Sequence, residues 1–323
     1  MKFANELSDG EKVESVFAAT EKQLKKTRQG KPFLSLRLAD KTGSVEAVAW
    51  DNAESLSLKF EKGDIVAVRA EVGSYNGSLQ LSVRELKKVP PEDYLERILP
   101  TTEKDVDAML MELRTAAQGV RTDWIKGLLL GFLDDPVFVE KFRTAPAAKG
   151  MHHVFAGGLL QHTLKVVRLV TLICDEYRVS DPLVAMMVDR DLLVAGAFLH
   201  DIGKVEELSS GAGFDYTFRG KLLGHVTLGL MALKEKLDGI PEKDPEKADL
   251  LMHMVISHHG EYEYGSPKRP KCMEAFILHY ADNLDAKLQG LAEFADKDVQ
   301  EGKFTAWHRL YERQFYKGGG TDK

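Results

Sequence analysis

Apolar and polar positions alternate with a period of two in the first ninety residues, and this period predicts β-strands. The alternation is clearest in the stretches 34–38, 45–49, 65–69 and 79–83. Turn sequences separate these stretches, namely Asp40-Lys41-Thr42-Gly43, Lys62-Gly63-Asp64 and Ser74-Tyr75-Asn76-Gly77. In the third stretch the pattern does not decide which side chains face inward, because Ile65 with Ala67 and Val66 with Val68 fit the period equally well.

About five short strands with one helical insert, at 53–60, predict a small Greek-key barrel of the OB type for residues 1–90. Barrels of this type bind single strands of nucleic acid with basic and aromatic side chains on one face. The candidate contacts in this sequence are Arg28, Lys31, Phe33, Trp50 and Tyr75, with Lys25 and Lys26 beside them. The alternative for each residue is structural, with the aromatic rings in the barrel core and the basic side chains in solvated loops.

Helical spacing replaces the alternation after Pro90-Pro91, which breaks the last strand and marks a linker. Residues 100–103 predict the start of a helix, with a threonine as its N-cap and Val106, Met109 and Leu113 on one face. A second helix around 124–132 ends at Asp134-Asp135-Pro136. Residues 91–150 are therefore expected to form a helical connector without chemistry of its own.

The most informative stretch is 195–204, where an apolar run ends in His200-Asp201. The run is too uniform for a surface helix and predicts a buried one. Burying an imidazole beside a carboxylate is costly unless it is compensated, and a divalent metal accepts both ligand types together. Lys204 would share their face on a continuing helix, although Gly203 weakens the helix there. An ammonium beside a metal indicates a phosphate ligand.

Histidines recur in the other apolar helical segments between 150 and 290. These segments contain His162, His225, the pair His258-His259, and His279 with Asp282. A lone histidine on an apolar face is usually a core residue with one ordinary hydrogen bond. Together with the His200 segment these are five separate buried segments, and each would need such a partner. One shared metal centre satisfies all of them.

Composition and charge narrow the class of protein. The chain has 323 residues, of which 44% are hydrophobic, and its two cysteines, Cys174 and Cys272, make no disulfide framework. Because the sequence has no transmembrane run and no signal-peptide core, we expect a cytoplasmic protein without membrane contact. Residues 1–90 contain 15 basic and 13 acidic residues, and the remainder contains 29 and 37. The net charge of −6 argues against a general nucleic-acid coat, and the acidic remainder fits a carboxylate-containing metal site.

The ordered set of histidines and aspartates resembles the HD phosphohydrolase superfamily, in which each ligand stands on its own helix. The resemblance implies that one divalent ion is bound by His162, His200, Asp201 and Asp282. It also implies that Asp201 bridges to a second ion, completed by His225 and by one of the pair His258-His259, with His258 preferred. The expected architecture is α+β and multidomain, an N-terminal OB-type β-barrel followed by an all-α HD-domain helical bundle. The expected boundaries are 1–90, 91–150, 151–290 and, for a C-terminal helix and tail, 291–323.

Longer phrases extend the resemblance to the YhaM family over nearly the whole chain. They are TRQGKPFL and DKTG in the barrel and GGLLQHT, FLHDIGK, GKLLGHV, SHHGEYEYGSP and HYADNLDAKL in the helical part. This family implies a homo-oligomeric 3′→5′ exoribonuclease that acts on single strands, is linked also to DNA ends, and releases nucleoside monophosphates. Manganese is the expected metal, with Mg²⁺, Co²⁺ or Fe²⁺ as alternatives. Gln161 stands where the family favours Glu, and this departure puts the metal affinity in question.

The resemblance also implies roles in the reaction. Two metals lower the pKa of a bridging water that attacks the last phosphodiester, and Lys204 meets the charge on the phosphoryl oxygens. Lys221, four residues before His225 and so on its face, and Arg219 are further candidate phosphate donors, with ordinary surface charge as the alternative. His153 is a candidate to protonate the leaving 3′ oxygen or to bind the terminal hydroxyl, whereas His152 and His279 are assigned to packing or to contacts behind the metal ligands. In the loop after the His pair, Tyr262 and Tyr264 could stack a base.

Other functions fit parts of this pattern. The first alternative is an HD-domain nucleotidase or cyclic-nucleotide phosphodiesterase, against which the strand-binding barrel argues. The second is a non-catalytic single-strand-binding protein with a structural metal, and the third is an iron oxygenase with the same ligand types. At the C-terminus, residues 304–316 form an amphipathic segment whose apolar stripe is suited to packing on its own domain or on another subunit.

Overall fold

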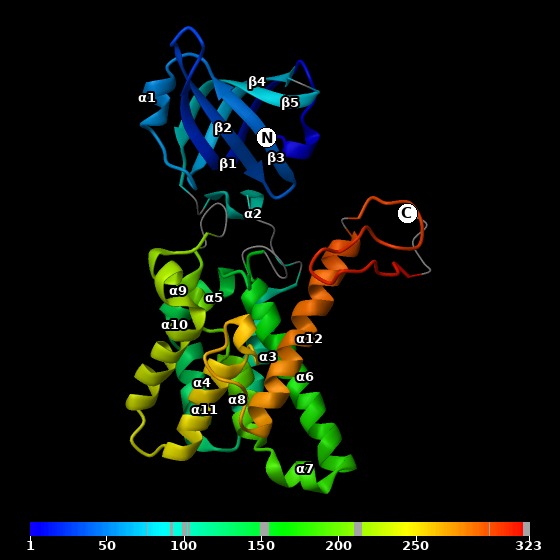
Figure 1. Ribbon diagram of the computed structural model, residues 1–323. Helices are drawn as coiled ribbons and strands as arrows, with labels where there is room; N and C mark the ends of the chain where they lie inside the picture. The colour runs from blue at the N-terminus through cyan, green and yellow to red at the C-terminus, as the bar shows by residue number, and fades with distance from the viewer. Residues whose placement is uncertain are drawn as a thin grey trace.

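The computed structural model describes residues 1–75, 77–90, 93–98, 102, 104–148, 155–209, 215–296 and 298–318. It shows an N-terminal β-barrel and a helical bundle, joined by a segment that contains the short helix α2 (Leu95–Ile98). The barrel lies at one end of the molecule and the bundle at the other (Figure 1). The predicted fold class, an OB-type barrel followed by an all-α domain, is confirmed.

The barrel is closed by five strands in the order β1-β2-β3-β5-β4. The strands are β1 (Lys12–Lys26), β2 (Pro32–Asp40), β3 (Gly43–Ala49), β4 (Ile65–Tyr75) and β5 (Ser78–Lys88), with helix α1 (Ala53–Ser57) after β3. The pairing of β3 with β5 is parallel, and the others are antiparallel. The period-two pattern works because every second residue faces the interior: Leu34, Leu36 and Leu38 are all buried there.

Both faces are buried at residues 15–19 of β1 and at Ile65 and Val66 of β4, which explains why the inward face of the third stretch stayed undecided. Val66 and Val68 point into the barrel, whereas Ile65 packs on the outside against Val89 and Ile98. Strand β1 was missed, because its central residues are buried without alternation. An outer apolar patch thus attaches the barrel to the segment that leads into the bundle.

The bundle contains one continuous apolar core. Its helices are α3 (Val106–Gln118), α4 (Asp123–Leu133), α5 (Pro136–Thr144), α6 (Gly158–Ser180), α7 (Pro182–Met187), α8 (Arg190–Leu199), α9 (Lys204–Glu207), α10 (Phe218–Asp238), α11 (Pro245–Ser257) and α12 (Met273–Asp296). Buried residues of α3, α4 and α5 share this core with α6 and α8. The predicted threonine cap of α3 is wrong, because the Asp105 carboxylate accepts the N–H groups of Asp107 and Ala108 at 2.9 and 3.1 Å.

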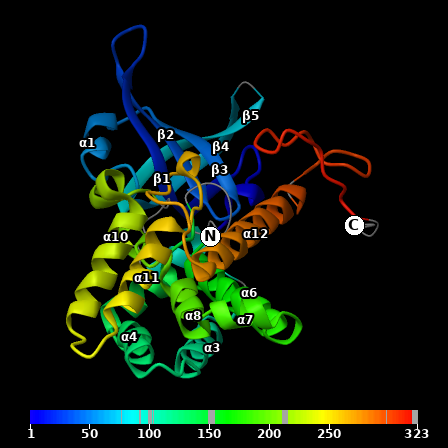
Figure 2. The same ribbon diagram turned by 60° about the horizontal axis from the view of Figure 1, so that its bottom comes forward.

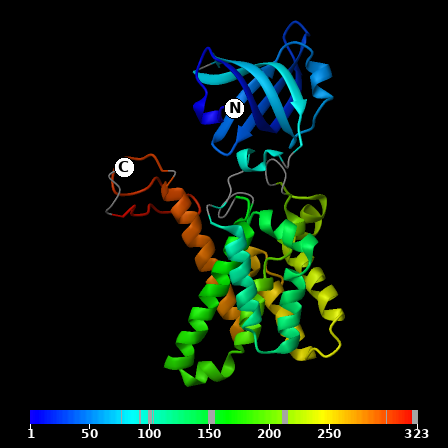
Figure 3. The same ribbon diagram turned by 180° about the vertical axis from the view of Figure 1, so that it is seen from behind.

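Helix α12 extends beyond the bundle and leads into the C-terminal segment, as Figures 2 and 3 show from two further directions. The helical interpretation of residues 304–316 is wrong. Phe304 pairs with Tyr316 and His308 with Arg313 as isolated antiparallel bridges, so the segment folds back on itself. Its aromatic residues belong to a compact hairpin-like loop, although their spacing in the sequence matches that of one face of a helix. Among the described helices, none combines the length and apolarity needed to cross a bilayer.

Candidate metal centre

Two helices end in a histidine that is oriented in the same way. The Nδ1 atom of His200, after α8, lies 2.8 Å from the carbonyl oxygen of Ala197, and that of His258, after α11, lies 2.7 Å from the carbonyl of Val255. A carbonyl oxygen only accepts, so each Nδ1 carries the proton. In the neutral form of each ring Nε2 is the atom without a proton, so this arrangement directs a possible metal ligand toward the interior.

The first donor cluster combines His162, His200 and Asp282. The Nε2 atoms of the two histidines are 3.2 Å apart, and Asp282 Oδ1 lies 3.1 Å from His162 Nε2. Asp201 Oδ2 is 3.5 Å from His162 Nε2 and 3.4 Å from His200 Nε2. Ligand atoms bound to one ion at roughly 2.0–2.2 Å are spaced in this way.

The second donor cluster combines His225, His258 and His259. The Nε2 atoms of His225 and His259 are 3.2 Å apart, and Asp201 Oδ1 lies 3.6 Å from the Nε2 atoms of both His225 and His258. Both members of the histidine pair therefore face the site, whereas the sequence left the choice between them open with His258 preferred. The two carboxylate oxygens of Asp201 point to different clusters, so this residue stands between them.

These residues fit divalent cations. Asp201 Oδ1 and His258 Nε2 are buried and have no hydrogen-bond partner within the described part of the chain. Burial by itself lowers the pKa of His162, but hydrogen bonds with Asp282 and Asp285 outweigh it and raise the pKa to about 9. The carboxylates thus favour positive charge at the position of the ring. A bound cation would supply that charge and satisfy the orphaned atoms.

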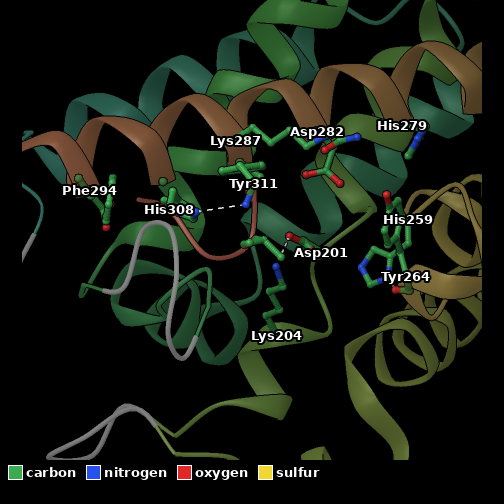
Figure 4. A pocket seen from close by; sticks show the side chains of 15 residues that line it. Asp201, Lys204, His259, Tyr264, His279, Asp282, Lys287, Phe294, His308 and Tyr311 are labelled. Atoms are coloured by element: carbon green, nitrogen blue, oxygen red, sulfur yellow. Dashed lines mark hydrogen bonds and ion pairs between the residues drawn. The ribbon is translucent and has the colours of Figure 1, made fainter. Parts of the chain in front are cut away.

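Lys204 completes the polar floor of the site. Its Nζ donates to Asp201 Oδ2 at 2.6 Å. Burial opposes a charged ammonium, but the adjacent Asp201 carboxylate outweighs it and raises the pKa of Lys204. Burial likewise opposes the Asp201 carboxylate, but the charge of Lys204 holds its pKa well below the usual range. Asp201, Lys204 and Asp282 line the same cavity of about 750 Å³, and residues of α12 form part of its wall (Figure 4).

Two carboxylates that sequence analysis missed orient the histidines from behind. Asp285 Oδ2 lies 2.8 Å from His162 Nδ1, and Asp285 Oδ1 lies 2.9 Å from the ammonium of Lys165. Glu207 Oε1 accepts the backbone N–H of His225 at 2.9 Å and lies 3.1 Å from its Nδ1. Such carboxylate–histidine pairs fix the tautomer of a ligand and raise its basicity. The position of Asp285, one helical turn after Asp282, is the signal that could have indicated it.

The other candidate site residues of the helical part are Lys221, Arg219, His152 and His153. Gly224 leaves the helical conformation, with φ 69° and ψ 160°, so α10 is kinked between Lys221 and His225. The argument that these two residues share one helix face is therefore wrong. Arg219 lies 3.7 Å from Glu206 in an exposed ion pair. His152 and His153 lie outside the described residues.

Two further residues have assigned partners. The His279 Nδ1 donates to the carbonyl of His258 at 2.8 Å, which agrees with a packing role behind the second cluster. The Gln161 Oε1 accepts from the Thr102 hydroxyl at 2.7 Å. The residue that departs from the family pattern thus contacts the connector.

The barrel presents an aromatic platform formed by Phe33 and Trp50. Their rings are stacked with centroids 4.9 Å apart, and 45% of Trp50 is exposed. The alternative that the Trp50 ring lies in the barrel core is therefore wrong. Lys31 lies 3.2 Å from Asp51, next to Trp50 in the chain, and Arg28 and Tyr75 are exposed. The platform is thus a surface on which a base can stack.

Gly203 is required by close packing between α9 and α10. A Cβ at this position would lie well inside 3.0 Å of the backbone of His225 and Gly229, a separation that real Cβ atoms essentially never show. We expect Gly203→Ala to destabilise the protein by about 1–3 kcal/mol, because backbone atoms must move and His225 moves with them. Thermal unfolding measures this effect. Gly127→Ala on α4, which meets nothing within 4 Å, should be neutral or stabilising, and an equal loss in both variants would contradict the packing argument.

Comparison with known proteins gives matches to both parts of the chain. Residues 159–287 match the family described as HD domain, and residues 19–89 match the family described as OB-fold nucleic acid binding domain. A relative from Geobacillus sp. (strain WCH70), named 3′-5′ exoribonuclease YhaM, is 37% identical over 297 residues, covering 89% of this chain and 86% of the relative. The protein of the same name from Bacillus subtilis (strain 168) is 36% identical over 299 residues, covering 89% of each chain. That from Listeria innocua is 34% identical over 302 residues, covering 92% of this chain and 91% of the relative.

Proposed function

This chain belongs to the YhaM family of 3′-5′ exoribonucleases, and on that basis we propose that it shortens single-stranded RNA from the 3′ end by metal-dependent hydrolysis. The observation that carries the proposal is Asp201, whose two oxygens face two separate His clusters. A site of this kind suits two divalent ions. Manganese is the proposed metal, with single-stranded DNA as a further substrate and nucleoside 5′-monophosphates as products.

Bound divalent ions would supply Lewis-acid polarisation of the phosphate and a water of lowered pKa. The chain's own residues do the rest. His162 and His225 are held in one tautomer by Asp285 and Glu207, so their Nε2 atoms face the site. Lys204 adds a fixed positive charge at the cavity floor, where negative charge develops on the phosphoryl oxygens.

Other assignments extend this proposal. His153 stays a candidate to protonate the leaving oxygen, and Lys221 and Arg219 stay candidates to contact the strand. The division into a strand-binding part at 1–90 and a catalytic part at 151–290 also stays a prediction. So do a cytoplasmic location and self-association.

A 5′-labelled single-stranded RNA, incubated with the protein and Mn²⁺, tests the proposal. We expect a ladder of products that shortens from the 3′ end and the release of nucleoside 5′-monophosphates. A circular RNA of the same sequence is the control, because it has no 3′ end and should stay intact. Cleavage of the circle would indicate an endonuclease. An intact linear RNA together with cleavage of a mononucleotide or cyclic nucleotide would favour the nucleotidase alternative.

The aromatic platform of the barrel yields a prediction about binding. We expect Trp50→Ala to weaken the binding of single-stranded RNA roughly 5- to 150-fold, the equivalent of about 1–3 kcal/mol for one stacked base. Fluorescence anisotropy in a chelator, which prevents hydrolysis, measures the change. Leu58→Ala removes an apolar side chain of the same barrel that is 87% exposed, and it should bind as the wild type does. Equal affinity of all three proteins would show that the strand binds elsewhere.

A further inference from the structure

The cavity in front of the metal clusters has a wall that neither family match includes. On one side lie Asp201, Lys204 and Asp282 of the HD-matched region. On the other side lie Phe294, near the end of α12, and His308, Leu310 and Tyr311 of the C-terminal segment. Figure 4 shows these side chains around one space, with His308 and Tyr311 opposite the histidine end of the site. The matched HD region ends at residue 287, so this wall is an addition to it.

The C-terminal segment has a defined structure that fixes this wall. Thr305 is fully buried. Its backbone N–H donates to the carbonyl oxygen of Phe315 at 2.8 Å, and its hydroxyl oxygen accepts the backbone N–H of Phe315 at 3.0 Å. His308 donates its backbone N–H to Arg313 at 2.9 Å. The His308 ring packs edge-to-face on Phe294 of α12, with centroids 4.5 Å apart. Through this contact the loop is anchored to the helix that carries Asp282.

The cavity is lined by both aromatic rings and lysines. The His308 ring lies 4.7 Å from the ring of Tyr311, which is partly buried at the cavity surface. Lys287 stands on the same face of α12 as Phe294, two helical turns before it. Lys287 and Lys204 supply positive charge at the wall and the floor. The ligand that combines a planar apolar ring with an anionic phosphate is a nucleotide.

We propose that the C-terminal segment forms the subsite for the 3′-terminal nucleotide, with its base against Tyr311 and its phosphate directed toward Lys287 and Lys204. This inference rests on the proposed function, because it names where the reacting end of the strand lies. It assigns to residues beyond the HD match a role in holding the substrate. The cavity volume of about 750 Å³ lies within the size range of ligand pockets, roughly 300–1,000 Å³.

Two RNAs that differ only at the 3′-terminal nucleotide test the subsite, one with a base and one abasic. With the full-length protein and Mn²⁺, we expect Tyr311→Ala to lower kcat/KM about tenfold or more on the RNA with the base and little on the abasic RNA. Tyr311→Phe keeps the ring and should behave as the wild type. Trp307→Ala is the matched control, since Trp307 is an exposed ring of the same segment outside the cavity. An equal loss on both RNAs, or no loss, overturns the proposal.

A binding measurement separates this inference from the proposed activity. An RNA with 2-aminopurine at its 3′ end, mixed with protein in a chelator, reports stacking by loss of fluorescence. We expect the wild type and Trp307→Ala to quench it and Tyr311→Ala to quench it much less. If quenching depends on Tyr311 but the RNA is never shortened, the subsite is supported and the proposed exonuclease activity is refuted. If the RNA is shortened but all variants quench equally, the exonuclease activity is supported and the subsite is refuted.

Discussion

Asp201→Asn is expected to abolish the shortening of single-stranded RNA, with a loss of about 10³-fold or more. The two oxygens of Asp201 lie 3.4–3.6 Å from Nε2 atoms of both histidine clusters, so this residue alone faces both candidate ion positions within the described site. Asn keeps the shape but loses the negative charge. A bound cation contributes several kcal/mol to a phosphoryl reaction, and each 1.36 kcal/mol is a factor of about ten in rate.

The metal content of the same variant supplies a second readout. We expect fewer Mn²⁺ ions per chain than in the wild type, measured by elemental analysis after dialysis. Asp249→Asn is the control, because Asp249 is an exposed carboxylate on α11, the helix that ends before His258. It should keep full activity and full metal content. An Asp201→Asn protein with wild-type metal content and rate would remove Asp201 from the centre of the site.

Asp285→Asn is expected to weaken metal binding and activity by about 10- to 100-fold, the usual effect of losing a carboxylate behind a ligand histidine. Asp285 touches His162 Nδ1 at 2.8 Å and Lys165 at 2.9 Å, and its side chain is fully buried. The Asn side chain no longer fixes the proton on Nδ1, so the ligand atom Nε2 is deprotonated and aimed at the site less often. Calorimetric titration with Mn²⁺ measures the affinity.

The dependence of the rate on Mn²⁺ concentration distinguishes the two variants. Because Asp285 acts through His162, excess Mn²⁺ should restore much of the activity of Asp285→Asn and none of that of Asp201→Asn. Asp249→Asn is again the control. If excess metal fails to restore Asp285→Asn while its thermal stability equals that of the wild type, the role of Asp285 is more direct than the geometry indicates.

Local patterns were sufficient for the barrel strands with one polar face. Leu34, Leu36 and Leu38 are inside because a strand alternates its side chains across the sheet. The same rule failed for β1 and left β4 open, because the patch around Ile65 and Val89 buries their outer faces as well. At the C-terminus, an apolar stripe with helical spacing belongs to a folded-back loop.

The sequence by itself determined the identities of the ligand atoms. Histidine and aspartate at the ends of apolar runs need compensation once they are buried, so their residue types predicted a metal centre before any geometry was available. The tertiary structure decided which atoms meet. Only the packing of α6, α8, α10, α11 and α12 brings His259 beside His225 and sets Asp285 behind His162. The backbone kink at Gly224, which separates Lys221 from His225, was likewise known only from the structure. Contacts between residues far apart in the chain depend on how helices pack, and local periodicity carries no information about that.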